Sequence, residues 1–164
     1  KRGFYTLRRE WSGESHIEVE LTYAPKLVNR PYNLRTAEYG PLVFALKIDN
    51  QKQKWEYVRN NVERTFPYCD WELSPVSEWQ YGFADTTLEV VEHDLHDSAF
   101  TENTPMLTLR ANLARINWGY RDGFLNVCAK TPKSRKALSE PVSVELIPYG
   151  CAKLRMTELP MVKK

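Results

Sequence analysis

The fold of this chain is decided by the stretch Tyr39-Gly-Pro-Leu-Val-Phe-Ala-Leu-Lys-Ile48. Every residue from Leu42 to Leu46 is apolar, and the run follows a Gly-Pro pair, which bends the backbone. A short apolar run of this kind is typical of a strand that is buried on both faces. A second strand-like run, Val142-Ser-Val-Glu-Leu-Ile-Pro148, lies near the other end of the chain. The two runs predict one β core that is closed late in the sequence.

Further segments are expected to be extended. Residues 16–23 alternate between apolar and polar side chains, the period of a half-buried strand, and residues 106–113 repeat this period. Shorter strands are expected at residues 5–10, 88–91, 142–147 and 153–158, and at 55–58, where the segment can pair with the central strand; residues 34–39 lead into that central strand. Residues 49–54 are expected as a polar loop, and residues 58–65 as a surface turn of helix or a long loop. The pattern predicts an all-β single domain spanning residues 1–164, an antiparallel β-sandwich of jelly-roll type with little helix.

Length and charge limit the function classes. The 164 residues suffice for one domain with a sizeable core. With 23 basic and 21 acidic residues the formal net charge is +2, so electrostatics does not indicate nucleic acid or a membrane surface as a partner. No apolar run approaches the ~20 residues that span a bilayer. Because the sequence starts at Lys1 with neither a start methionine nor an apolar signal core, we expect it to be cut from a longer protein.

The chemistry-bearing residues do not form a recognisable catalytic motif. His93 and His96 are three residues apart, which places them on one face of a helix but on opposite faces of a strand. We therefore expect them to belong to a solvated charged loop and assign no metal or cofactor. Glu18 and Glu20 share a strand face that the alternation turns toward water. No GxSxG elbow or phosphate-binding glycine loop is present, so we expect no catalytic residue and no enzymatic activity in this chain alone.

Cysteines and aromatic residues are the remaining candidates. The three cysteines, Cys69, Cys128 and Cys151, are far apart, allow at most one internal disulfide and are expected to be small core residues. The chain also has five Trp and nine Tyr. Flat rings on a β surface can stack on sugar faces; alternatively, they fill the core or dock against a neighbouring domain. The candidate carbohydrate-binding or docking residues are Trp55, Trp71, Trp79, Tyr81 and Trp118.

Three blocks carry a resemblance to a known family. They are Tyr39-Gly-Pro-Leu-Val-Phe-Ala-Leu46, Ser74-Pro-Val-Ser-Glu-Trp-Gln-Tyr-Gly-Phe83 and Val144-Glu-Leu-Ile-Pro-Tyr-Gly-Cys-Ala-Lys-Leu-Arg-Met-Thr157. In order and spacing they resemble the C-terminal β region of the bacterial β-L-arabinofuranosidase family, glycoside hydrolase family 127 and its relatives. In that family the catalytic cysteine, with glutamate and cysteines around a zinc, belongs to an α/α barrel that precedes the β region. No segment here matches that barrel, so the resemblance transfers no catalytic or metal residue.

The resemblance implies a non-catalytic accessory β-sandwich that packs against an upstream catalytic domain and stabilises it. On this interpretation we expect an exposed apolar patch around Trp79 and Tyr81. The alternative is a carbohydrate-binding module that holds plant or microbial polysaccharide through two or three coplanar surface rings. The partners expected are thus the upstream domain and an oligosaccharide, and not nucleic acid or membrane. The compartment is left open by the sequence, although a polymer-degrading parent protein would be periplasmic or secreted.

Overall fold

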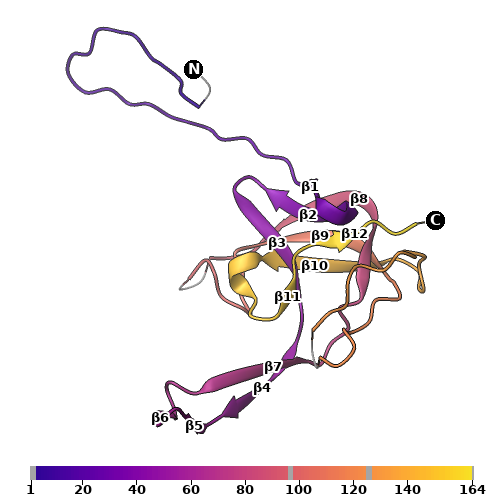
Figure 1. The fold of residues 1–164 in the computed structure, drawn as a ribbon. Coiled ribbons are helices and arrows are strands. Elements are labelled where there is room, and N and C mark those ends of the chain that lie inside the picture. The colour runs from indigo at the N-terminus through magenta and orange to yellow at the C-terminus, as the bar shows by residue number, and fades with distance from the viewer. Residues whose placement is uncertain (1–2, 96–97, 125–126, 164) are drawn as a thin grey trace.

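The computed structural model describes residues 3–95, 98–124 and 127–163 and is all-β (Figure 1). Its main sheet has the strand order β1-β2-β3-β10-β9-β8, with β11 added to β3 and β12 added to β2. Every strand ladder in the described residues is antiparallel. The sheet curls until β1 contacts β8, which confirms the predicted sandwich-like all-β architecture. Its strands are β1 (Lys26–Arg30), β2 (Leu34–Tyr39), β3 (Leu42–Lys47), β8 (Tyr81–Glu92), β9 (Leu107–Arg115), β10 (Val142–Pro148), β11 (Arg155–Met156) and β12 (Leu159–Pro160).

The two apolar runs of the sequence lie side by side at the centre of this sheet. Leu146 pairs with Leu46 and Pro148 with Phe44, so β10 is the neighbour of β3. Three consecutive residues of β3, Phe44 to Leu46, are buried, as expected for a strand that is covered on both faces. The prediction of one core that is closed late in the chain is therefore confirmed. Residues 55–58 do not pair with β3, and that prediction is wrong, because β2, β10 and β11 occupy its edges.

The core is formed by side chains from the inner face of the curled sheet. Phe44 and Leu46 of β3 pack with Phe83 of β8, Leu109 of β9 and Leu146 of β10, all at most 5% exposed. Burial of a Leu or Phe side chain stabilises a fold by roughly 1.5–3 kcal/mol, so the side chains of these strands hold the sheet in its curled form. Two one-turn 3-10 helices, η1 (Pro31–Asn33) and η2 (Tyr149–Cys151), connect strands at the rim. Of the expected strand at residues 153–158 only Arg155–Met156 forms a strand, β11, and β12 follows directly after this range; the two pair with different neighbours.

A two-stranded ribbon leaves the body of the molecule, as Figure 1 shows at the bottom of the view. In it β4 (Asn50–Trp55) pairs with β7 (Asp70–Pro75), and the ribbon ends in the hairpin of β5 (Tyr57–Arg59) and β6 (Val62–Arg64). The expected polar loop at 49–54 and helix turn or loop at 58–65 are therefore wrong. The strands β4, β5 and β6 are exposed along nearly their whole length, and β4 carries no apolar alternation. Asn60 and Asn61 both have positive φ (53° and 57°), as a tight type I′ hairpin turn requires.

Residues 3–25 form an extended N-terminal arm that projects from the sheet (Figure 1). No residue of this arm belongs to a strand, so the strands expected at residues 5–10 and 16–23 are wrong. The alternation at 16–23 is suited to a sheet edge, but within the described residues no strand pairs with it. Only the base of the arm is packed, where the Tyr23 and Tyr39 rings meet edge to face with centroids 6.1 Å apart.

Candidate interaction surfaces

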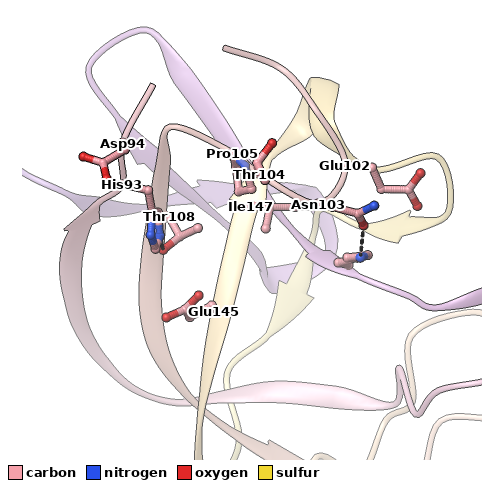
Figure 2. Close-up of a pocket in the computed structure, with 10 residues that line it drawn as sticks. His93, Asp94, Glu102, Asn103, Thr104, Pro105, Thr108, Glu145 and Ile147 are labelled. Atoms are coloured by element: carbon pink, nitrogen blue, oxygen red, sulfur yellow. Dashed lines mark hydrogen bonds between the residues drawn. The ribbon is translucent and has the colours of Figure 1, made fainter. Parts of the chain in front are cut away.

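A small polar pocket of about 370 Å³ surrounds His93, at the end of β8 (Figure 2). His93 Nε2 lies 3.0 Å from Thr108 Oγ1, and Lys47 Nζ donates to Asn103 Oδ1 at 3.5 Å. Figure 2 shows the carboxyl groups of Asp94, Glu102 and Glu145 spread around the pocket and pointing in different directions. His96 and Asp97, the other members of the sequence cluster, lie outside the described residues. Within the part of the chain that is described, no three His, Cys, Asp or Glu side chains converge as metal ligands would.

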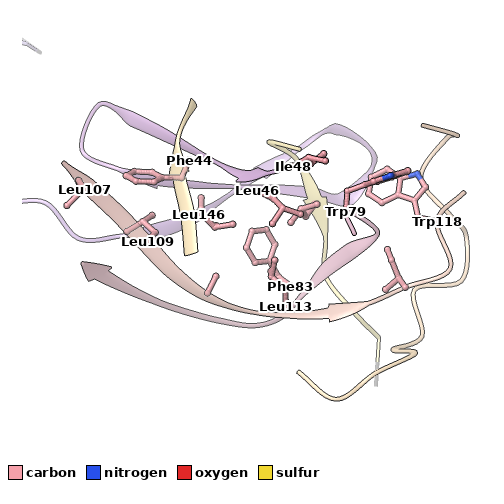
Figure 3. Packing of buried hydrophobic residues seen from close by; sticks show 14 residues of the cluster. Phe44, Leu46, Ile48, Trp79, Phe83, Leu107, Leu109, Leu113, Trp118 and Leu146 are labelled. Carbon is pink, nitrogen blue, oxygen red and sulfur yellow. The ribbon is translucent and has the colours of Figure 1, made fainter. Parts of the chain in front are cut away.

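Two of the five candidate aromatic residues, Trp79 and Trp118, belong to the core. They are 3% and 6% exposed, their rings meet with centroids 5.8 Å apart, and Figure 3 shows them at one end of the apolar cluster. Trp79 Nε1 donates to the Tyr120 hydroxyl at 3.1 Å, and Trp118 Nε1 donates to the Ala129 carbonyl at 2.9 Å. Because both indoles are packed with their N–H groups satisfied, neither can contact sugar or a partner surface without local opening.

An exposed apolar patch is expected around Trp79 and Tyr81. The expectation is wrong for Trp79, because this side chain is buried in the core. Tyr81, at the start of β8, is half-buried, and its hydroxyl donates to Glu78 Oε2 at 3.2 Å. Burial, followed by the adjacent Glu78 carboxylate, raises the pKa of the Tyr81 phenol. The ring therefore closes the edge of the core and offers only part of one side to solvent.

The other two candidates, Trp55 and Trp71, are exposed on the β4–β7 ribbon, at 49% and 43%. Trp71 is directly opposite Lys54, whereas Trp55 is opposite Asp70. Since successive side chains of a strand point to opposite faces, Trp55 and Trp71 lie on different faces of the ribbon. The structure thus brings these two rings onto the same element but not into one flat platform for a sugar chain.

Each ribbon face holds its tryptophan with polar contacts. Trp55 Nε1 donates to Glu72 Oε2 at 2.9 Å, and on the other face Lys52 Nζ lies 3.7 Å from the centre of the Trp71 ring. Next to Trp55, the Tyr57 hydroxyl donates to Asp70 Oδ2. This carboxylate raises the pKa of Tyr57, because it favours the protonated phenol.

The tip of the ribbon carries exposed apolar side chains that sequence reasoning missed, with Val58 and Val62 on opposite faces of the β5–β6 hairpin. Its side chains Val58, Val62, Phe66 and Tyr68 are 66%, 51%, 69% and 77% exposed. The backbone here is held in place, because the Phe66 N–H donates to Glu56 Oε1 at 2.9 Å. That bond, followed by the bond from Lys54, lowers the pKa of Glu56. An ordered hairpin thus presents apolar side chains to water, as interaction sites do.

The N-terminal arm is the second apolar surface that projects from the body. Ile17, Val19 and Leu21 are 56%, 73% and 67% exposed, and Phe4 and Tyr5 near its start are 79% and 91% exposed. The alternation at 16–23 predicts a half-buried strand of the sandwich, and the structure does not contain this strand. In the structure these apolar side chains lie outside the sheet and are exposed to water.

The three cysteines form no disulfide within the described residues, and two of the three are buried as expected. Cys69 and Cys151 are buried, whereas Cys128 is exposed, which corrects its assignment to the core. Burial raises the pKa of the Cys151 thiol. Cys128 lies in a long connection after β9 that the sheet does not cover, so nothing buries it.

Comparison of the chain with protein-family models, with curated proteins and with solved structures finds no match. Over the residues that are described, no helix has the length and apolar character needed to cross a membrane.

Proposed function

We propose that this chain is a non-catalytic accessory β domain that docks against another domain of its own polypeptide and stabilises it. On the resemblance described above, that neighbour is the α/α-barrel catalytic domain of a β-L-arabinofuranosidase-like glycoside hydrolase, and the parent protein is periplasmic or secreted. The observation that carries the proposal is the exposed apolar character of both projecting segments, the arm at 3–25 and the ribbon tip at 56–68.

Burial of these segments would supply a substantial docking energy. Each Val, Leu, Ile or Phe side chain that becomes buried contributes roughly 1.5–3 kcal/mol. Free association loses about 4–15 kcal/mol of translational and rotational freedom, which a few such side chains only just offset. A covalent connection raises the effective concentration of the partner to about the millimolar range, so that modest contacts suffice. Two apolar projections on one small domain therefore fit a partner in the same chain.

The experiment uses the polypeptide encoded immediately upstream of Lys1, produced separately and titrated with the 164-residue chain by calorimetry. We expect binding that weakens about tenfold or more in the variant Leu21→Ser/Val58→Ser, which removes one apolar side chain from the arm and one from the ribbon tip. Leu138→Ser is the matched control. Leu138 is 62% exposed, against 67% for Leu21 and 66% for Val58, and lies on neither projection.

Three results would contradict the proposal. The upstream segment could lack a helical barrel, the titration could show no heat, or Leu138→Ser could weaken binding as much as the double variant. A circular dichroism spectrum of each variant confirms that the sheet is intact before its affinity is compared.

A further inference from the structure

A groove of about 980 Å³ lies on the main body between the connection at 128–135, η1 and the segment that carries η2 and β11. Its floor is apolar and includes Leu34, Trp118 and Met156, of which the first two are buried. A groove of this size with an apolar floor is within the range of small-molecule and oligosaccharide sites.

Two tyrosines provide exposed rings along this groove. Tyr32 is 82% and Tyr149 is 49% exposed. The Tyr32 backbone has φ 61° and ψ 25°, a left-handed conformation that is unusual for a bulky residue. Arg135 holds this turn by donating to the carbonyls of Tyr32 at 3.0 Å and Asn33 at 3.2 Å. Backbone strain that neighbouring contacts maintain is a feature of ligand sites, and here its effect is to hold an aromatic ring out of the core.

The second ring is also fixed by a cation. The Arg155 guanidinium carbon lies 3.7 Å from the centre of the Tyr149 ring, and Arg155 donates to the Ala152 carbonyl as well. Tyr149 thus has one contact that fixes its ring, while about half of its surface remains open to a ligand. Tyr32 and Tyr149 therefore line the same groove and can contact one ligand together. The ribbon residues Trp55 and Trp71 cannot do so, because they lie on opposite faces of the ribbon.

The groove is more cationic than the rest of the molecule. Lys130, Lys133 and Arg135 line it with Glu158 as the one carboxylate of the lining, whereas the whole chain is nearly neutral at +2. Lys130 and Lys133 are exposed, and neither forms a salt bridge with any residue that is described. The side chains of Thr131 and Thr157 add hydroxyl groups to the same lining.

We propose that this groove binds an acidic oligosaccharide, a sugar chain that carries carboxylate groups. The tyrosine rings and the partly exposed Met156 side chain receive the C–H faces of the sugar rings, the threonine and tyrosine hydroxyls bond to sugar hydroxyls, and Lys130 and Lys133 receive the carboxylates. The mixture of rings, hydroxyls and a few separate cations favours such a ligand over a compact polyphosphate. The inference does not depend on the docking proposal, which concerns the arm and the ribbon.

The test is a calorimetric titration of the 164-residue chain with trigalacturonic acid, with maltotriose as the neutral comparison. We expect trigalacturonic acid to bind more tightly than maltotriose, and its advantage to shrink as salt screens the lysines. The variant Lys130→Gln/Lys133→Gln should bind at least about fivefold more weakly. Tyr32→Asn should lose about tenfold, since asparagine tolerates the positive φ while removing the ring.

The matched controls are Lys26→Gln/Lys54→Gln and Tyr68→Asn, which remove two lysines and an exposed tyrosine outside the groove. Both should bind trigalacturonic acid as the unmodified chain does. A flat titration would overturn the inference, and so would equal losses in the groove variants and the controls. Tighter binding of ATP than of trigalacturonic acid would also overturn it, because the groove would then be a phosphate site.

Discussion

At the scale of the residue, Asp85 organises an irregular part of β8. Between Phe83 and Leu88 the register against β9 changes, because Phe83 is opposite Leu113 and Leu88 is opposite Ala111. The Asp85 carboxylate spans this bulge: Oδ2 accepts from Asn112 Nδ2 at 2.9 Å and Oδ1 accepts from the Thr87 N–H at 2.8 Å. The Asn112 bond, followed by the Thr87 bond, lowers the pKa of Asp85 below its ordinary value.

The first prediction follows from that lowered pKa. Asp85→Ala should reduce the free energy of unfolding by about 1 kcal/mol at pH 7, because a backbone N–H and an amide lose their acceptor. Since the folded-state pKa of Asp85 lies below the unfolded value, the stability it contributes is complete above the unfolded pKa. It is lost as the pH falls through the folded-state pKa. The loss of stability caused by Asp85→Ala should therefore shrink as the pH is lowered through that folded-state pKa.

Urea unfolding of the unmodified chain and of the variant at several pH values measures this difference. Thr86→Ala, one position along the same bulge, is the control, because its effect should not depend on pH. A cost of Asp85→Ala that stays constant from neutral to acid pH would show that the charged carboxylate contributes nothing at this site.

At the scale of the element, the contact between β8 and the segment of β12 sets a strict steric limit. A Cβ atom at Gly82 would lie 2.8 Å from the Pro160 carbonyl oxygen and 3.1 Å from Val162 Cγ2. The Val162 N–H donates to the Phe83 carbonyl at 2.8 Å, so the two chains cannot easily move apart. Glycine is needed here for close approach of two backbones.

The second prediction is that Gly82→Ala lowers the free energy of unfolding by about 1–3 kcal/mol, although removing a glycine usually favours the folded state. Gly119→Ala is the matched control, because a Cβ atom there meets nothing within 4 Å. It should change the stability by no more than about 0.5 kcal/mol. The measurement is the midpoint of thermal unfolding of Gly82→Ala and of Gly119→Ala, recorded in parallel. Equal midpoints for the two variants would mean that the β8 and β12 segments are not tightly packed in solution.

The elements that could be predicted from the sequence are those whose side chains enter the core. The apolar run at Leu42, the final run at Val142 and the alternation of residues 106–113 correspond to β3, β10 and β9. The ribbon strand β4 was missed because its pairing rests on backbone hydrogen bonds between polar residues, which leave no burial pattern. Conversely, residues 16–23 of the arm have the apolar–polar alternation of a half-buried strand, but they pair with no strand in the described residues.

The candidate site was predicted only in part, for a related reason. The abundance of aromatic residues predicts five candidates, which are Trp55, Trp71, Trp79, Tyr81 and Trp118. The sequence alone does not distinguish a tryptophan that is buried in the core from one that is exposed on the surface. Tyr32 and Tyr149 were missed because their exposure depends on a left-handed turn and on an arginine contact, and neither has a sequence signature.

At the scale of the whole molecule, the closed sheet and its two projections have different physical tasks. The sheet buries its apolar residues inside itself, whereas the arm and the ribbon tip place theirs in water. Water makes such exposure unfavourable unless another surface covers it, so the projections are where the molecule is expected to associate. Their removal should therefore affect association and not folding.

The third prediction separates those two properties on the arm. The variant Ile17→Ser/Val19→Ser/Leu21→Ser should keep the free energy of unfolding within about 0.5 kcal/mol, because these side chains are more than half exposed. The same variant should self-associate less in sedimentation velocity and should enhance the fluorescence of a hydrophobic dye less. Tyr23→Ser is the contrast, because the Tyr23 ring packs on Tyr39 and on Gly40, and its loss should cost about 0.5–1.5 kcal/mol. If the triple variant proves the less stable of the two, the arm must pack on the sheet in solution, and the docking role assigned to it would have to pass to the ribbon tip alone.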